Sequence, residues 1–393
     1  MRRNFLILLL TLCTLTLQSA YAQNRPIPYP LPAGPIVADV FNARIKMSLV
    51  ARGIPHAFGF VVLPDGDILV TERYTPAMRV VHNGVLNPEP LQGLPAIRTG
   101  FHSGLLDVEV HPRYSENHLI YFTYHTALEN NNSYAITLGR ARYDGGPVLQ
   151  DFEQLFIGTP MTLSGGSRLV FAPDGKLFIT VGGAMDRQPL AQDLGRLEGK
   201  VLRLNEDGSV PADNPFVGRT DVRPEIWSYG HRDQYGLAIH PETGELFHAE
   251  LGPLGGDKIN IIKPGGNYGW PLYGYGAYND GEPMASINRE GIEQALIIWQ
   301  PGIVPSGLLF YTGEAFPQWQ GNLFAGSIQR GRIPGTGGLE RVVFDSRMWE
   351  RQRETLATEW HQRIRDVSQG PEGFIYILSE EEDGAIIRIE PAE

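Results

Sequence analysis

The 393-residue sequence contains a single cysteine, Cys13, which lies in an N-terminal segment with the features of an export signal. Two arginines precede an apolar run that ends at Leu17, and a small-residue cleavage site ends at Ala22. The apolar run is too short to span a bilayer comfortably, and Cys13 lacks the small preceding residues of a lipoprotein signal. We therefore expect a signal peptide over residues 1–22, no membrane anchor, and a periplasmic or secreted mature chain without disulfides or thiol chemistry.

Basic residues are also scarce. The chain has 33 Lys and Arg against 44 Asp and Glu, for a formal net charge of −11. Binding to nucleic acid phosphates or to anionic membranes depends on an excess of cations. The balance therefore argues against nucleic acid and membrane-surface partners. The 46 glycines and 30 prolines favour many turns over long helices.

Several motifs of well-known enzyme classes are missing. The sequence has no H-E-x-x-H, no G-x-S-x-G, no P-loop and no G-x-G-x-x-G after a strand. These absences exclude the zinc-protease, α/β-hydrolase and nucleotide-binding sites that such motifs mark. The glycine-rich stretch at 273–281 does not fit a dinucleotide fingerprint, and we interpret it as an irregular loop.

What the sequence does contain is one hairpin pattern that occurs six times. In each copy a short apolar strand meets a turn built on proline with Asp, Glu or Gly, and an alternating strand follows. The turns recur at intervals of about 50 to 75 residues, enough for four strands plus loop insertions. The turn prolines are Pro64, Pro112, Pro173, Pro241, Pro317 and Pro371.

Six such units predict an all-β fold, a six-bladed β-propeller over residues 45–393, after an N-terminal extension at 23–44. The alternative is a β-sandwich, which would not reuse one hairpin six times. We expect segments 46–50 and 386–389 to pair and close the ring. The longest inserts, at 182–227 and 252–299, are where we expect chemistry, because loops at one mouth of the channel carry the site.

Polar clusters stand next to three of the predicted strands. One contains His231, Arg232 and Asp233, and another is the glycine-rich stretch at 249–271. The third places Arg363 and Arg365 on one face of a strand, since alternate residues point the same way. Arginines and carboxylates at strand ends also form salt bridges between blades, so a structural role stays open for each.

Seven ordered blocks of the sequence resemble a known family. They include 104–112, 167–182, 199–216, 223–232, 267–271, 304–326 and 363–373. The chain resembles the soluble, pyrroloquinoline quinone (PQQ)-dependent sugar dehydrogenases, also called the glucose/sorbosone or aldose sugar dehydrogenase family. The resemblance covers essentially the whole mature chain. It implies a six-bladed propeller in which a sugar or aldehyde substrate passes hydride to a calcium-polarised quinone, with a periplasmic electron acceptor.

The resemblance also implies roles for individual residues. Arginines suit the three carboxylates of PQQ, and carbonyl oxygens suit calcium. Gly252 and Pro253 are then backbone ligands of the catalytic calcium, and Tyr268 belongs to a second metal site. The residues expected at the cofactor are Gln192, Arg232, Trp299, Arg363 and Arg365.

The chain departs from the family where the base histidine is expected. That position is Ser164, and a serine hydroxyl cannot replace an imidazole as a base at neutral pH. We expect His102, in place of a family glutamine, to be the substitute base beside Arg232. Asp233, in place of an asparagine, is the second candidate, although a carboxylate among arginines is a weak base.

A second departure concerns the metal. Lys258 stands where the family has a calcium-ligand glutamate, so a lysine can replace the second ion electrostatically. Three functions therefore stay open: a PQQ enzyme with a rebuilt site, a propeller that binds a ligand or partner without catalysis, and a metal-assisted hydrolase or lactonase. The last would need clustered carboxylates, and the sequence offers Asp233, Glu250 and Asp257.

Overall fold

The computed structural model describes residues 29–100, 102–128, 133–161, 163, 165–185 and 187–392. The expected signal peptide and Ser164 lie outside these residues. The chain divides into two compact units, 1–30 and 31–393. The architecture described below is that of the second unit.

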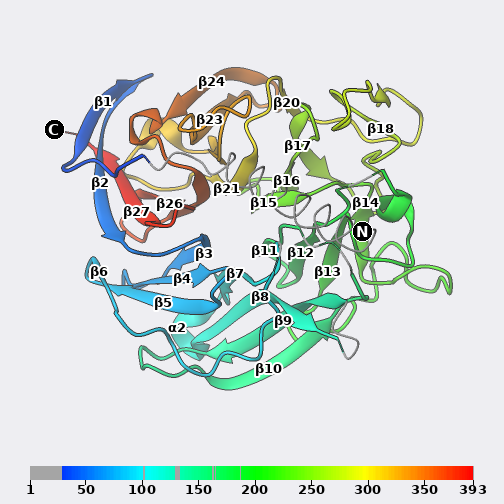
Figure 1. Cartoon of the computed structure of the whole chain (residues 1–393), viewed down its shortest axis with the longest axis horizontal. Coiled ribbons are helices and arrows are strands. Elements are labelled where there is room, and N and C mark those ends of the chain that lie inside the picture. Colours follow the sequence, from blue (N-terminus) through cyan, green and yellow to red (C-terminus); the bar gives the residue numbers. More distant parts are fainter. Residues whose placement is uncertain are drawn as a thin grey trace, which may run out of the picture. The chain divides into compact units, whose positions relative to one another are not determined.

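Residues 31–393 form six antiparallel sheets around a common centre, which confirms the six-bladed β-propeller (Figure 1). Five of the sheets have four strands and the sixth has five. The strands of each sheet follow in order from the centre outwards. The first sheet consists of β3 (Ala57–Val62), β4 (Ile68–Glu72), β5 (Ala77–His82) and β6 (Val85–Leu86); the second of β7 (Leu105–Val110), β8 (Leu119–Ala127), β9 (Tyr134–Arg142) and β10 (Gln150–Ile157); and the third of β11 (Leu169–Phe171), β12 (Leu177–Val181), β13 (Lys200–Leu204) and β14 (Ile226–Tyr229). The fourth sheet consists of β15 (Gln234–Ile239), β16 (Leu246–Glu250), β17 (Asp257–Ile262) and β20 (Ile297–Trp299); the fifth of β21 (Pro305–Phe310), β22 (Leu323–Ser327), β23 (Gly338–Phe344) and β24 (Glu350–Leu356); and the sixth of β25 (Ile364–Gln369), β26 (Ile375–Ser379), β27 (Ala385–Pro391), β2 (Ala43–Arg52) and β1 (Ile36–Val40).

Each repeated hairpin joins the first and second strands of one sheet, and each predicted turn proline lies in that connection. The turn after β11 shows the cause. Gly175 takes a φ of +79°, which glycine adopts without strain, and its amide donates to the Ala172 carbonyl at 2.9 Å. The Lys176 amide donates to the Asp174 carboxylate at 3.0 Å. Short-range turn chemistry therefore sets the innermost strand pair of each blade.

The two ends of the described unit meet in the sixth sheet. Strand β2 pairs with β27, with Met47 opposite Ile389 and Leu49 opposite Ile387, so the predicted closing pair is confirmed. Strand β1 lies in the segment that the sequence analysis treats as an extension, and it pairs with β2 at the outer edge. The pairing of β2 with β27 joins the beginning of the unit to its last blade and holds the ring closed.

Apolar clusters fill the spaces between neighbouring sheets. Between the fifth and sixth sheets, Trp319, Trp360 and Ile364 are almost fully buried, and similar clusters lie between the other pairs. Burying such a side chain stabilises the fold by about 1.5 to 3 kcal/mol relative to leaving it exposed. The blades therefore form one continuous rigid support for the loops.

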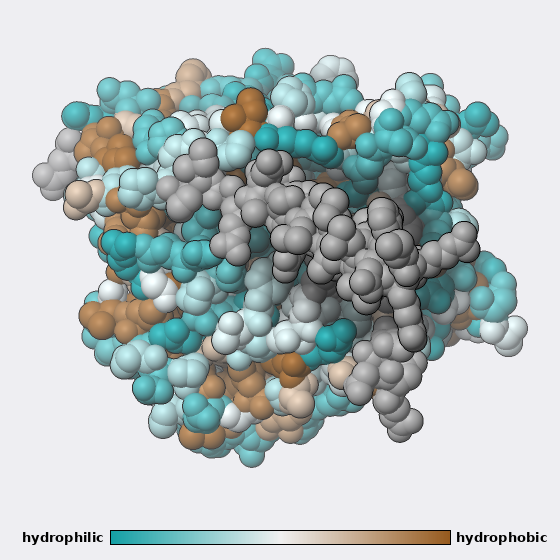
Figure 2. Space-filling view, in the orientation of Figure 1, coloured by the Kyte–Doolittle hydropathy of each residue, from teal (hydrophilic) through white to brown (hydrophobic). Residues whose placement is uncertain are grey.

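The outer surface is mixed in character. On the face in Figure 2, hydrophilic and hydrophobic residues are interspersed over the blades. The described residues include no helix that is both long and apolar enough to cross a membrane. The helical elements are single turns, such as α2 (Tyr114–Asn117).

Inner strands of five of the six blades meet at one buried side chain, that of Arg168. Its Nη1 donates to the carboxylates of Asp107 and Asp366, at 2.8 Å each. Its other donors reach the carbonyls of Phe58, Tyr235 and Arg365 at 2.8 to 3.1 Å. Arg168 thus ties inner strands of five blades together. It also lines a cavity of about 380 Å³, whose remaining walls come from the later parts of the inner strands.

Candidate active site

Several predicted site residues lie where the inner strands begin. His102 precedes β7, Arg232 and Asp233 directly precede β15, and Arg363 directly precedes β25. Because neighbouring inner strands surround one axis, the loops that precede them gather at one end of the channel. We call this end the mouth and define it by Arg73, His102, Gly165, Arg232, Asp233, Arg363 and Arg365.

Arg73, which follows β4, connects two of these loops. Its Nη2 donates to the His102 carbonyl and, at 3.3 Å, to the Gly165 carbonyl. Its guanidinium lies 4.8 Å from the centre of the Phe58 ring. The sequence analysis missed Arg73. Its position after the second strand of the first blade was the available signal, but its contacts come from blades far away in sequence.

Arg363 and Arg365 lie on the same side of the sixth blade and share one carboxylate, Glu380. Arg365 Nη2 contacts Glu380 Oε2, and Arg363 Nη2 lies 3.6 Å from Glu380 Oε1. Burial, with further contributions from Arg363 and Arg73, lowers the pKa of Arg365 to about 9. Burial also lowers the pKa of Arg363. Glu381 also attracts Arg363, while Arg73 and Arg168 add positive charge next to Arg365.

Arg232 and Asp233 complete the mouth on the fourth blade. Arg232 is 9% exposed, its pKa is lowered by burial, and its guanidinium lies 5.4 Å from the Trp270 ring centre. The Asp233 carboxylate accepts from the Gly166 amide at 2.9 Å. A Cβ on Gly165 would come within 2.0 Å of that carboxylate. Glycine at 165 therefore makes room for Asp233 beside the position of the expected base.

The pKa values of the two predicted bases shift in opposite directions, because burial disfavours the charged form of each. Burial, then Arg73 and Arg365, lower the pKa of His102 to about 4. Burial is also the main influence on Asp233, and it raises the pKa of that carboxyl despite Arg232. At neutral pH His102 is therefore an uncharged, weak base, whereas the basicity of Asp233 is increased.

The predicted calcium ligands lie in the loop after β16. The Pro253 carbonyl accepts from Arg332 Nη2 at 2.8 Å, and the Gly252 amide donates to Asp257 at 2.8 Å. Both residues line a largely apolar cavity of about 320 Å³, together with Gln300 and Arg332. An arginine therefore supplies positive charge to a carbonyl that the sequence assigns to calcium.

Three other predicted residues make contacts outside the mouth. Gln192 forms a reciprocal amide pair with Asn267, at 2.9 and 3.0 Å. The Trp299 indole is buried between the fourth and fifth blades and donates to Glu340 at 3.2 Å. The Tyr268 hydroxyl donates to the Ile261 carbonyl at 2.6 Å and accepts from the Lys263 amide at 2.9 Å.

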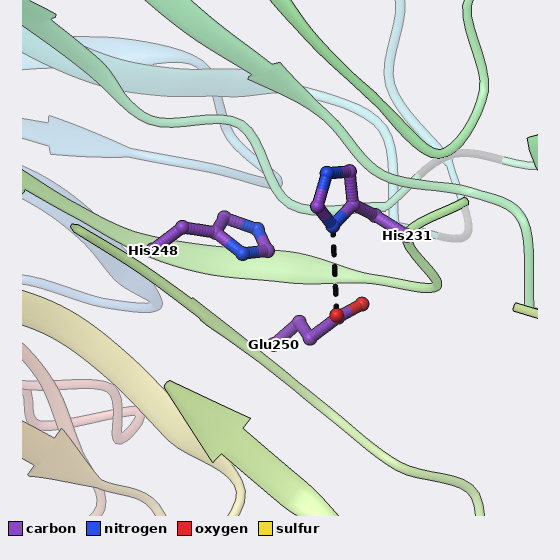
Figure 3. A group of neighbouring side chains, drawn as sticks. All are labelled: His231, His248 and Glu250. Atoms are coloured by element: carbon purple, nitrogen blue, oxygen red, sulfur yellow. Dashed lines mark ion pairs between the residues drawn. The ribbon is translucent and has the colours of Figure 1, made fainter. Parts of the chain in front are cut away.

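Behind Arg232 lies a buried polar cluster of His231, His248 and Glu250 (Figure 3), with Lys258 beside it. His231 Nδ1 is 3.5 Å from Glu250 Oε1, and Lys258 Nζ is 3.2 Å from the same oxygen. Lys258 and the two histidines lower the pKa of Glu250 well below its usual range, against the effect of burial. Tyr268 stacks on His231 instead of offering its hydroxyl, so the residues present do not fit a second calcium ion.

The three carboxylates that a hydrolase would need all lie near Arg232, but each already has a hydrogen-bond or ion-pair partner. Glu250 is paired with Lys258, and Asp233 with the Gly166 amide. Asp257 accepts from the Gly252 and Val304 amides at 2.8 and 2.7 Å. Each carboxylate is therefore engaged by a different part of the fold.

The mouth fits an anionic ligand. Among the described residues, the Nε atoms of Arg73, Arg232 and Arg365 are buried and have no hydrogen-bond partner. Four guanidinium groups around one opening suit several carboxylates, as in PQQ. For calcium the fit is conditional, because the ion would have to displace Arg332 from Pro253.

Comparison with known proteins agrees with this geometry. The family model described as Glucose / Sorbosone dehydrogenase matches residues 54–388. The chain is 38% identical to the uncharacterized protein slr1608 of Synechocystis over 90% of this chain and 88% of the relative. It is 34% identical to the aldose sugar dehydrogenase YliI of Escherichia coli over 89% of this chain and 94% of the relative.

Solved structures give the same result. A glucose dehydrogenase crystal structure aligns with a TM-score of 0.82 at 34% identity, covering 88% of this chain and 99% of that one. The PQQ-bound aldose sugar dehydrogenase of Streptomyces coelicolor aligns with a TM-score of 0.71 at 26% identity, covering 92% and 99%.

Proposed function

Because the chain belongs to the glucose/sorbosone dehydrogenase family, we propose that it binds PQQ at the mouth and oxidises a sugar hydroxyl through an altered active site. The observation that carries this proposal is the cluster of buried arginines whose pKa values are lowered. Carboxylates of a bound cofactor would compensate their charge. Bound PQQ would supply the electrophile that accepts hydride from the substrate.

Arg232, Arg363 and Arg365 are the proposed cofactor-binding residues, with Arg73 beside them. A ligand carboxylate would compete with Glu380 for Nη2 of Arg363 and of Arg365, whereas Nε of Arg365 has no partner among the described residues and is available to it. Gln192 and Trp299 are assigned a supporting role, since their contacts hold loops and blades around the mouth.

For the proton that leaves the substrate hydroxyl, the contacts favour Asp233 over His102. The Asp233 carboxylate lies against Gly165, next to the expected base position, and burial makes it more basic. His102 is better suited to present an uncharged imidazole to the ligand. This order reverses the expectation from the sequence, which had no information on burial.

In this proposal calcium can bind only when Arg332 leaves the Pro253 carbonyl. When the ion binds at the Gly252 and Pro253 carbonyls, Arg332 must swing away, and its exposed loop allows this. The substrate is then a small sugar or aldehyde. Export by the N-terminal signal would bring the enzyme to a periplasmic electron acceptor.

The proposal is tested by reconstituting the mature chain with PQQ, with and without calcium, and adding aldoses and a redox dye. We expect sugar-dependent dye reduction that falls at least ~10²-fold in Asp233→Asn, the usual contribution of a positioned base. The control Asp221→Asn removes a carboxylate from an exposed pair with Arg219, far from the mouth, and should leave the rate unchanged. Full activity in Asp233→Asn would remove this carboxylate from the mechanism.

A binding protein without catalysis is the second candidate. It is favoured by the low pKa of His102 and by Ser164 at the base position. It predicts PQQ binding that resists substitution of Asp233, together with no reduction of the quinone by any aldose.

A further inference from the structure

The buried cluster behind the mouth brings together groups that commonly bind transition metals. His231, His248 and Glu250 offer ligand atoms that all lie within 4.8 Å of one another. All three side chains are at most 1% exposed, and Figure 3 shows both rings beside the carboxylate. Two imidazoles and a carboxylate form a typical donor set for zinc.

A side-chain cation already stands beside this carboxylate. Lys258 Nζ lies 3.2 Å from Glu250 Oε1, the same oxygen that His231 approaches at 3.5 Å. Lys258 is itself 6% exposed. A metal ion on this oxygen would lie next to the ammonium group in a dry environment, where repulsion between cations is strong.

The hydrogen bonds of the cluster fix its charge. Asn260 Nδ2 donates to Glu250 Oε1 at 3.0 Å and contacts His248 Nδ1 at 3.4 Å, so that ring nitrogen is the acceptor and His248 is neutral. Lys258 supplies one ammonium group to the one carboxylate of the cluster. The Glu250 charge is therefore compensated without a further cation.

The cluster is also connected to the mouth. Glu250 Oε2 accepts from the backbone amide of Arg232 at 2.7 Å. A displacement of the Glu250 carboxylate would therefore also displace the backbone of Arg232, which we place at the cofactor. A buried carboxylate keeps this role only while a cation compensates its charge.

We infer that Lys258 is a built-in cation that takes the place of a metal ion among His231, His248 and Glu250 and thereby holds the Arg232 backbone at the mouth. Lys258 is a positioning residue, since it acts through Glu250. The inference does not depend on the identity of the cofactor. It implies that removing the ammonium group converts the cluster into a zinc or cobalt site.

The test uses the full mature chain as wild type, Lys258→Met and Lys258→Gln. Co²⁺ is titrated while visible absorption is recorded, because a histidine–carboxylate cage gives Co²⁺ a characteristic spectrum. We expect no cobalt band for the wild type, and melting that is unchanged by EDTA. Each variant should melt lower in EDTA, recover on adding Zn²⁺, and give a one-to-one cobalt band that His248→Gln abolishes.

Hydrogen exchange supplies the positioning readout. In the variants without metal, exchange of the peptide at 228–238 should rise at least ~5-fold, and metal should restore protection, while a peptide at 119–127 in the second blade stays unchanged. The matched control Lys263→Met removes a lysine from an exposed pair with Glu293 and should show none of these effects.

Two results would overturn the inference. One is a wild-type protein that holds stoichiometric metal and loses stability in EDTA. The other is a Lys258 variant, either Met or Gln, that neither exchanges faster at 228–238 nor gains a cobalt band. Neither readout depends on PQQ, so failure of the proposed dehydrogenase activity would leave this result intact.

Discussion

Two buried arginines, Arg168 and Arg365, lie next to each other yet have opposite surroundings. All three nitrogens of the Arg168 guanidinium donate, to two carboxylates and three carbonyls. Coulombic attraction by Asp366 and Asp107 raises its pKa, against the effect of burial. Arg365 contacts Glu380 through Nη2, its Nε has no partner among the described atoms, and its pKa falls to about 9.

The difference separates a structural arginine from one that we propose to bind a ligand. A buried guanidinium with all its donors used contributes to the fold, and its removal leaves carboxylates without compensation. A buried guanidinium with unused donors and excess positive charge lowers stability, and an anion can recover that loss. Burial alone would not have distinguished the two.

The largest expected effect is at the axis. Arg168→Met leaves Asp107 and Asp366 buried without a cation, and should lower the free energy of unfolding by about 3 to 5 kcal/mol. Chemical denaturation measures this loss. Arg203→Met is the control, because its partners Asp174 and Asp213 are exposed and keep their hydration. A loss below about 1 kcal/mol for Arg168→Met would contradict its structural role.

At the mouth the same type of change should act on the ligand instead of the fold. Arg365→Gln removes a charge-assisted contact worth about 1.5 to 3 kcal/mol, so the dissociation constant for PQQ should rise about 10- to 100-fold. The unfolding free energy should change by less than about 1 kcal/mol. If Arg365→Gln destabilises the fold as strongly as Arg168→Met does, the proposed distinction between the two arginines is wrong.

His102 makes the stability of the protein depend on pH, which gives a separate test of the environment at the mouth. Its pKa in the folded state is about 4, below the ordinary value of 6.5, so the unfolded chain binds the proton more readily. Stability from the neutral imidazole is therefore present above pH 6.5 and lost as the pH falls toward 4. His102→Gln should reduce this acid loss by about 3 kcal/mol between pH 7 and pH 4. Equal acid sensitivity in wild type and variant, measured by denaturation at each pH, would be inconsistent with this environment.

The smallest expected effect is at Pro253. Arg332→Gln removes the guanidinium from the Pro253 carbonyl and should increase calcium affinity about 5-fold, corresponding to about 1 kcal/mol. Calcium titration with the quinone present measures this change. Arg289→Gln, which lies on an outer loop, is the control and should have no effect. Weaker calcium binding in Arg332→Gln would show that the arginine assists the ion.

Sequence reasoning predicted the fold well because its determinants are local. Each turn proline and its neighbours specify a hairpin within about ten residues, and the chain repeats that information six times. Even the closing pair of β2 with β27 was predictable, since the two apolar segments had no other partner. The role of Arg168 as the common partner of inner strands was not predictable, because its contacts come from residues as distant as Asp366.

Prediction of the site was likewise limited by contacts between residues that lie far apart in the sequence. Arg232, Asp233, Arg363, Arg365 and His102 were named from the sequence and lie together at the mouth, and their role at a cofactor stays a prediction. Their counter-charges were missed: Glu380 for the arginine pair and Glu250 for Lys258.

Two further expectations from the sequence depended on the direction or the burial of a side chain. The Trp299 carbonyl accepts from the Gly256 amide of the calcium loop at 3.2 Å, but its indole donates to Glu340 of the next blade. The basicity of His102 and Asp233 depends on burial, which a sequence does not record.

The most direct test of the whole account is calorimetric titration of PQQ into the metal-stripped mature protein, with and without calcium. The account predicts saturable one-to-one binding at micromolar concentrations or below, weakened in Arg365→Gln and unchanged in the exposed control Arg219→Gln. Absence of binding at about 100 µM PQQ, with calcium present, would contradict the claim that the mouth arginines await a carboxylate ligand of this kind.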